Sequence, residues 1–237
     1  MRPMEFAKRT AANKAIDYFM EDPVPRIESM MATVNKMLPD ALFPSQRKAF
    51  NKAIEERNNW YQLICRVADL DPDVATGLLK CFLTEANLVA WDKQEKSREK
   101  YQCNIPWAVL LDPTSACNLH CTGCWAAEYG HKLNLSYDDI DSIINQANEL
   151  GTHVFIYTGG EPLVRKGVVD LIREINDIPE IEDISLTTNG ILLPKMAPEL
   201  REAGLTRVNI SLDTLDPAQF SYVTRLGKIE DVFAGID

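Results

Sequence analysis

The sequence lacks several features that mark whole classes of protein. No stretch approaches the roughly 18 consecutive apolar residues of a membrane span, and the N-terminus MRPMEFAKRT has no apolar core of a secretory signal. An excess of basic residues is also missing, because 25 Lys and Arg stand against 35 Asp and Glu, a net charge of −10. Nucleic acids and anionic membranes require basic patches that neutralise phosphates. We therefore expect a cytoplasmic protein with a small-molecule ligand and with neither nucleic acid nor a membrane as partner.

Alternating strand patterns are absent from the first hundred residues. This region is rich in Lys, Glu, Ala, Met and Leu, and prolines at 23, 25, 39, 44 and 72 mark its breaks. Residues 73–92 have apolar positions three and four apart, which predicts a helix with one buried face. The charged run KQEKSREK at 93–100 predicts a solvated surface or linker. The sequence thus predicts an α-helical N-terminal region over residues 1–100.

The pattern changes at about residue 105 to short apolar strands that alternate with amphipathic helices. Strands are predicted over 107–112, 153–157, 183–188 and 206–212, and helices over 136–150, 166–177, 194–204 and from 216 onward. Ser136 suits the N-cap of the first of these helices, and Gly151 suits its end. The alternation predicts an α/β fold, with a parallel sheet of about four βα units over residues 105–237.

Cys117, Cys121 and Cys124 lie close together in the sequence, after the first predicted strand. Thiolates are soft ligands, and several in one loop can hold zinc or an iron–sulfur cluster. The spacing supplies three ligands, one fewer than a closed zinc site or a cubane cluster uses. One coordination position would stay open, and at such a position a substrate or cofactor can bind.

Other interpretations of the cysteines remain open. The spacings of four and three residues would also place all three thiols on one helical face as core residues, although Pro113 disfavours a helix there. A zinc site is a second alternative, in which the three cysteines would be completed by His120, His131 or Cys103. Cys65 and Cys81 lie in apolar helical patterns, where we expect buried, inert thiols.

Small and polar residues follow the other predicted strands. Gly159, Gly160 and Glu161 come directly after the second strand, Thr187, Thr188 and Asn189 end the third, and Ser211 ends the fourth. Paired glycines allow a backbone to approach a ligand closely, while each polar residue alone is also a common turn former. The carboxyl ends of parallel strands meet at one edge, where βα proteins place their active sites. We therefore expect these residues to share a site with the cysteines.

The segment CNLHCTGC at 117–124 resembles the Cys-x3-Cys-x2-Cys motif of the radical S-adenosylmethionine superfamily. The resemblance implies a 4Fe-4S cluster held by Cys117, Cys121 and Cys124, with S-adenosylmethionine bound to the fourth iron and cleaved reductively. It also implies that Gly159, Gly160 and Glu161 contact the methionyl amino group, and that Ser211 and Asn189 belong to the same cofactor site. The expected fold is then a partial (β/α) barrel, and an electron donor such as flavodoxin or ferredoxin is the expected protein partner.

Two parts of the chain resemble two different groups within this superfamily. Residues 159–237, with GGEPLVRKG and AGLTRVNISLDTLDPAQF, resemble the GTP 3′,8-cyclase family of molybdenum-cofactor biosynthesis, which implies GTP as substrate and Thr187 as a residue that contacts it. Residues 1–158 resemble a radical S-adenosylmethionine group with a helical N-terminal extension. The two resemblances predict a fusion of related sequences and an incomplete barrel. The alternative hypotheses are a non-catalytic cluster-binding or zinc-binding protein and a zinc-stabilised interaction module.

Overall fold

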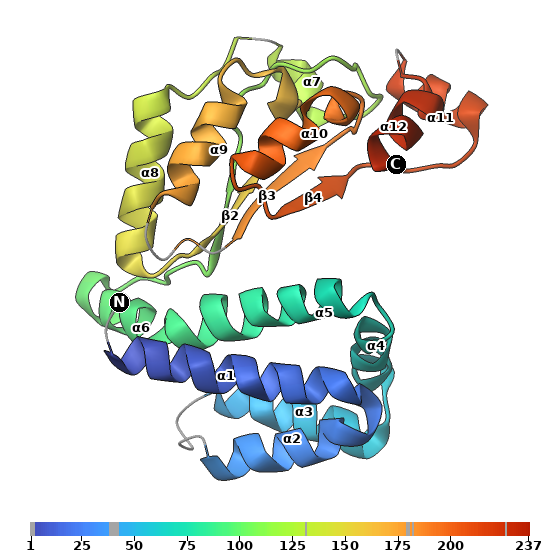
Figure 1. Ribbon diagram of the computed structural model, residues 1–237. Helices are drawn as coiled ribbons and strands as arrows, with labels where there is room; N and C mark the ends of the chain where they lie inside the picture. The colour runs from blue at the N-terminus through green and yellow to red at the C-terminus, as the bar shows by residue number, and fades with distance from the viewer. Residues whose placement is uncertain (1–2, 38–42, 131, 179–180, 182, 226) are drawn as a thin grey trace. The chain divides into compact units, whose positions relative to one another are not determined.

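The computed structural model describes residues 3–37, 43–130, 132–178, 181, 183–225 and 227–237 (Figure 1). The backbone separates into two compact units, Met1–Val89 and Ala90–Asp237. The division into domains with a boundary near residue 100 stays a prediction. Within the described residues, no helix is both long enough and apolar enough to cross a membrane.

The first unit consists of helices, as its composition predicts. Its elements are α1 (Pro3–Glu21), α2 (Pro23–Met37), α3 (Pro44–Glu56), α4 (Asn59–Ala68), α5 (Pro72–Leu79) and the π-helix η1 (Lys80–Val89). Pro23, Pro44 and Pro72 begin their helices, where a missing N–H costs nothing and the fixed φ favours helix entry. The helix predicted over 73–92 is confirmed as two consecutive helical elements, because the α-helix α5 widens into the π-helix η1 at Lys80.

A buried ion pair joins the two ends of this helical unit. The Arg9 guanidinium on α1 donates to both carboxylate oxygens of Glu85 on η1, with Nε–Oε1 and Nη2–Oε2 distances of 2.7 Å. The two side chains are only 15% and 7% exposed. A bidentate pair of this kind fixes orientation, although the cost of desolvating both charges offsets much of its attraction.

The second unit begins with α6 (Trp91–Tyr101), which contains the charged run at 93–100. The prediction of a solvated surface is confirmed for the charged side chains of this run, none of which is buried, but it is wrong for the two uncharged residues of the run. Gln94 is 3% exposed and Ser97 is 8% exposed, and the Gln94 amide donates to the carbonyl of Gly151 at 2.8 Å. A polar side chain can be buried when it has such a partner, and composition alone does not reveal that partner.

Four parallel strands form the sheet: β1 (Ala108–Leu111), β2 (Val154–Tyr157), β3 (Asp183–Thr188) and β4 (Arg207–Ile210), in the spatial order of the sequence. The predicted strands are confirmed within two residues at each end. Leu111 aligns with Tyr157, Tyr157 with Leu186, and Thr188 with Ile210. All four strands therefore deliver their following residues to one edge, as the α/β prediction requires.

Helices α8 (Tyr137–Leu150), α9 (Val168–Asn176) and α10 (Leu193–Glu202) lie along one face of the sheet in Figure 1. They enclose a core to which alternate strand residues contribute, among them Leu111, Phe155, Tyr157, Ile184 and Leu186. Leu110 alternates with these residues and is 65% exposed. The elements α7 (Trp125–Tyr129), η2 (Pro162–Val164), α11 (Pro217–Thr224) and α12 (Ile229–Ile236) complete the described part of this unit.

A substitution at the N-cap of α8 tests whether the predicted cap stabilises the fold. The backbone N–H of Asp139 donates to Ser136 Oγ at 3.1 Å, and the Ser136 N–H donates to the Asp139 carboxylate at 3.1 Å. Ser136→Ala should lower the free energy of unfolding by about 1 kcal/mol, measured by urea denaturation. Ser142→Ala, on an exposed turn of the same helix, is the control. Equal losses in both variants would contradict a capping role.

Candidate functional site

The turn after β2 packs directly onto the loop that carries the cysteines. Gly160 N donates to the carbonyl of Thr114 at 2.9 Å, and Glu161 N donates to that of Ala116 at 2.7 Å. A Cβ on Gly160 would lie 2.2 Å from the Ala116 oxygen, and Gly159 has a φ of +110°. These glycines are therefore required by the approach of two protein segments, whether or not they also contact a cofactor.

Glu161 lies at the centre of this contact and is 1% exposed. Its Oε1 accepts from Thr188 Oγ1 at 2.7 Å and from Leu163 N at 3.0 Å, and its Oε2 accepts from Asn189 N at 2.8 Å. Burial raises the pKa of this carboxyl, while the three donors act in the opposite direction. The side chain thus joins the end of β2 to the end of β3, and Oε2 retains capacity for a further donor.

The cysteine loop has a second attachment at the C-terminal end of α11. Thr122 N donates to the carbonyl of Val223 at 2.8 Å, and His120 N donates to that of Thr224 at 3.4 Å. The last carbonyls of a helix have no partner within it, so these loop amides satisfy two of them. The residues on both sides of Cys121 are therefore held by a segment about 100 positions downstream.

The three thiols lie in one electrostatic neighbourhood. Each is partly buried, and the structure contains no disulfide to any of them. Burial is the main cause that raises the pKa of the Cys117 thiol, and Glu161 and Cys124 raise it further. Burial likewise raises the pKa of Cys121, with Cys124 and Cys117 as further causes. Partly buried thiols that disfavour one another's ionisation match the donor set that a positively charged metal group would stabilise.

Among the described residues, no three His, Cys, Asp or Glu side chains converge closely enough to hold one metal ion. The ligands of a cubane cluster each bind a different iron, so they do not have to converge on one point. The assignment of the three cysteines as metal ligands accordingly stays a prediction. For the zinc alternative, Cys103 is exposed and precedes β1, whereas the loop follows β1. His131 lies outside the described residues.

The remaining predicted site residues differ in how closely they join this network. Asn189 takes part through both its backbone and its side chain, whose Nδ2 donates to Asn118 Oδ1 at 2.7 Å. Ser211 contributes a backbone N–H to the carbonyl of Thr188 at 2.9 Å, while its side chain is exposed. Thr187 is partly buried. Because successive side chains of β3 lie on opposite faces of the sheet, Thr187 is on the face opposite to Leu186 and the core.

Sequence reasoning missed Asn118 as a member of this network. Its adjacency to Cys117 was the one available signal, because a hydrogen-bond partner 71 positions away leaves no local pattern. The sequence does place Thr188 at the end of the third strand, but it does not reveal the bond from Thr188 to the Glu161 carboxylate 27 positions away. Cys65 and Cys81 also differ from expectation, since both are partly exposed rather than buried.

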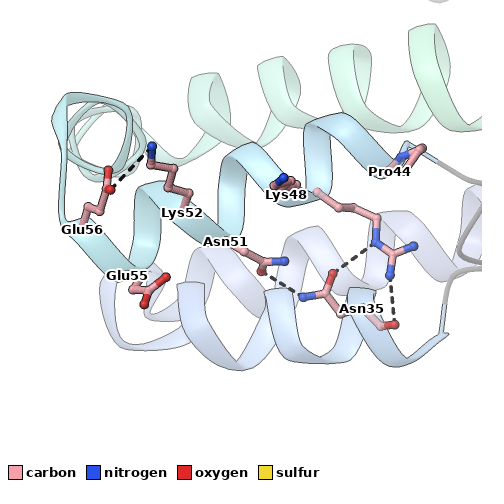
Figure 2. A pocket seen from close by; sticks show the side chains of 8 residues that line it. Asn35, Pro44, Lys48, Asn51, Lys52, Glu55 and Glu56 are labelled. Carbon is pink, nitrogen blue, oxygen red and sulfur yellow. Dashed lines mark hydrogen bonds and ion pairs between the residues drawn. The ribbon is translucent and has the colours of Figure 1, made fainter.

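A groove of about 680 Å³ lies in the helical unit between α2 and α3 (Figure 2). Several of its polar side chains pair with one another. Asn35 Nδ2 donates to Asn51 Oδ1 at 2.9 Å, and Lys52 Nζ lies 3.7 Å from Glu56 Oε1. The lining mixes both signs of charge and includes none of the residues that the motifs indicate. The cysteine loop is therefore the stronger candidate site.

Comparison with known proteins adds independent findings. A family model described as the Radical SAM superfamily matches residues 111–237. GTP 3′,8-cyclase of Petrotoga mobilis is 48% identical over 142 residues, which cover 58% of this chain and 44% of that protein. GTP 3′,8-cyclase of Heliobacterium modesticaldum is 47% identical over 129 residues, covering 52% and 39%. The chain spans less than half the length of these relatives.

Among solved structures, Streptococcus suis SuiB bound to S-adenosylmethionine gives a TM-score of 0.45 at 19% identity. The match covers 76% of this chain and 40% of that one.

The tight contact at Gly160 predicts the effect of a single methyl group. Gly160→Ala places a Cβ against the backbone of Ala116, so we expect a loss of stability of about 1–3 kcal/mol in thermal unfolding of the metal-free protein. The matched control is Gly77→Ala on α5, where nothing lies within 4 Å of the new Cβ. The control should stabilise the protein slightly, because alanine favours a helix more than glycine. An unchanged Gly160→Ala variant would contradict the packing described above.

Proposed function

Because the chain belongs to the radical S-adenosylmethionine superfamily, we propose that it binds a 4Fe-4S cluster through Cys117, Cys121 and Cys124 and cleaves S-adenosylmethionine reductively. The family resemblance of the cysteine motif is confirmed by the model match over residues 111–237. This region contains the cysteines, the Gly-Gly-Glu turn and the ends of β3 and β4. The proposal rests on one observation: the region that matches the family model contains the residues that hydrogen bonds join into the candidate site.

The chain's own residues have distinct parts in the proposed site. The three thiolates would hold the cluster, and because the loop supplies no fourth cysteine, one coordination position would remain for S-adenosylmethionine. When bound, the cluster supplies the single electron that cleaves the sulfonium of S-adenosylmethionine. Gly159 and Gly160 lie against the cysteine loop, and Oε2 of Glu161 can accept from one further donor such as an amino group. Ser211 and Asn189 complete the proposed cofactor contacts.

GTP is the proposed substrate, with 3′,8-cyclisation as the reaction and Thr187 as a contact residue. Support comes from relatives named GTP 3′,8-cyclase at 48% and 47% identity. Because these matches span less than half of each relative, the activity, the substrate and a flavodoxin-like or ferredoxin-like electron donor are all proposals for this chain. A cytoplasmic location is likewise proposed, from the composition and charge.

Anaerobic reconstitution with iron and sulfide tests the cluster. The wild-type chain should bind iron and, with dithionite and S-adenosylmethionine, release 5′-deoxyadenosine. Replacing Cys117, Cys121 or Cys124 by alanine should lower the amount of bound iron at least about tenfold. Even the loss of a residue that only hydrogen-bonds to a metal ligand lowers metal affinity by about that factor. Cys103→Ala is the matched control, because that exposed thiol lies before β1, and it should leave both readouts unchanged.

Other outcomes of the same experiment distinguish the alternatives. One zinc per chain with no iron uptake would reject the enzyme and support a zinc-binding module. Iron uptake without 5′-deoxyadenosine above the Cys121→Ala background would support a non-catalytic cluster protein. If 5′-deoxyadenosine forms, its rate should rise with GTP and not with ATP. Equal rates with both nucleotides would contradict GTP as substrate while leaving the cleavage reaction intact.

A further inference from the structure

We propose that Asn118 is a positioning residue, whose side-chain amide fixes Cys117 relative to the end of β3 through Asn189. The inference deepens the proposed function, on which its significance for the cluster rests. The hydrogen bond from Asn189 Nδ2 to Asn118 Oδ1 is 2.7 Å long and joins residues 71 positions apart. It is a side-chain contact between the cysteine loop and the turn after β3.

The direction of this hydrogen bond follows from its surroundings. Asn189 Oδ1 accepts from the backbone N–H of Ile191 at 3.1 Å, and a backbone N–H can only donate. The amide nitrogen of Asn189 must therefore point toward Asn118. Asn118 in turn has to present its oxygen, so it is the acceptor and Asn189 is the donor.

Cys117 is enclosed by a ring of hydrogen bonds that this pair closes. On one side of the cysteine, the carbonyl of Ala116 accepts from Glu161 N at 2.7 Å. On the other side, Asn118 accepts from the Asn189 side chain. The ring is completed where Asn189 N donates to the Glu161 carboxylate at 2.8 Å. Both neighbours of Cys117 are thus tied to residues that are tied to each other.

Cys121 depends on a different attachment. Its neighbours His120 and Thr122 donate to the end of α11, through the carbonyls of Thr224 and Val223. Breaking the Asn118–Asn189 bond should therefore release Cys117 and leave Cys121 in place. This selectivity separates a positioning role from a general contribution to stability.

Thiol alkylation of the reduced, metal-free protein measures the release. Iodoacetamide modification of each cysteine is followed by peptide mass spectrometry, with the exposed Cys103 as an internal reference. In Asn118→Ala and Asn189→Ala, the Cys117 rate relative to Cys103 should rise about fivefold, as expected when one hydrogen bond is lost from a local opening equilibrium. The Cys121 rate should change less than about twofold by the same reasoning. Asn145→Ala is the matched control, because the hydrogen bonds of its side-chain amide among the described residues stay within α8, to Asp141.

Two further substitutions separate hydrogen bonding from space filling. Asn118→Asp keeps an acceptor for Asn189 and should preserve slow alkylation of Cys117. Asn118→Leu keeps the size of the side chain but removes the acceptor, so it should accelerate alkylation as Asn118→Ala does. A merely space-filling role would leave the Cys117 rate of Asn118→Leu at the wild-type value.

Three outcomes would overturn the proposal. They are an unchanged Cys117 rate in both alanine variants, equal acceleration at Cys117 and Cys121, and an Asn118→Asp variant that behaves like Asn118→Ala. Because the assay contains neither iron nor S-adenosylmethionine, its result is independent of whether the cluster forms. If the proposal holds and the cluster forms as well, the alanine variants should also lose iron faster to a chelator than wild type does.

Discussion

Burying a carboxylate costs free energy unless hydrogen-bond donors surround it, and Glu161 meets this condition with donors from its own turn and from the end of β3. The backbone of the same residue holds Ala116, one position before the first cysteine of the motif. Through its side chain and its backbone together, this one buried residue therefore joins three chain segments. Removing its charge or its donors would disturb the cysteine loop before any ligand is considered, because an unsatisfied buried group is more costly than the bond it loses.

The interior of the α/β unit explains why much of the fold could be predicted. The strand β2 is almost wholly buried, so its apolar run Val154–Tyr157 stands out from the surrounding polar sequence. The cap at Ser136 and the positive φ of Gly151 at the other end of α8 follow local chemistry that four or five residues specify. Once parallel strands are inferred, the meeting of the cysteine loop and the Gly-Gly-Glu turn at one edge follows from topology.

What the sequence could not reveal depends on partners far along the chain. The charged run at 93–100 reads as solvated, yet Gln94 is buried because Gly151 offers a carbonyl. No sequence pattern indicates the hydrogen bond between Asn118 and Asn189 or the one from Thr188 to Glu161. Gly160 could be interpreted as a ligand contact from its motif, but its tightest neighbour is the backbone of Ala116. Tertiary geometry decides each of these cases, and no local propensity records it.

The attachment of the cysteine loop to α11 has a consequence for how the protein is made. A polypeptide is synthesised from its N-terminus, so the three thiols emerge long before Val223 and Thr224, whose carbonyls hold the loop. Until then the amides of His120 and Thr122 lack these partners, whereas the neighbours of Cys117 can already pair with Glu161 and Asn189. A cluster on all three thiols, as proposed above, would therefore have a fully restrained loop only after α11 is synthesised. A short peptide that carries only the cysteine motif would lack the same restraints.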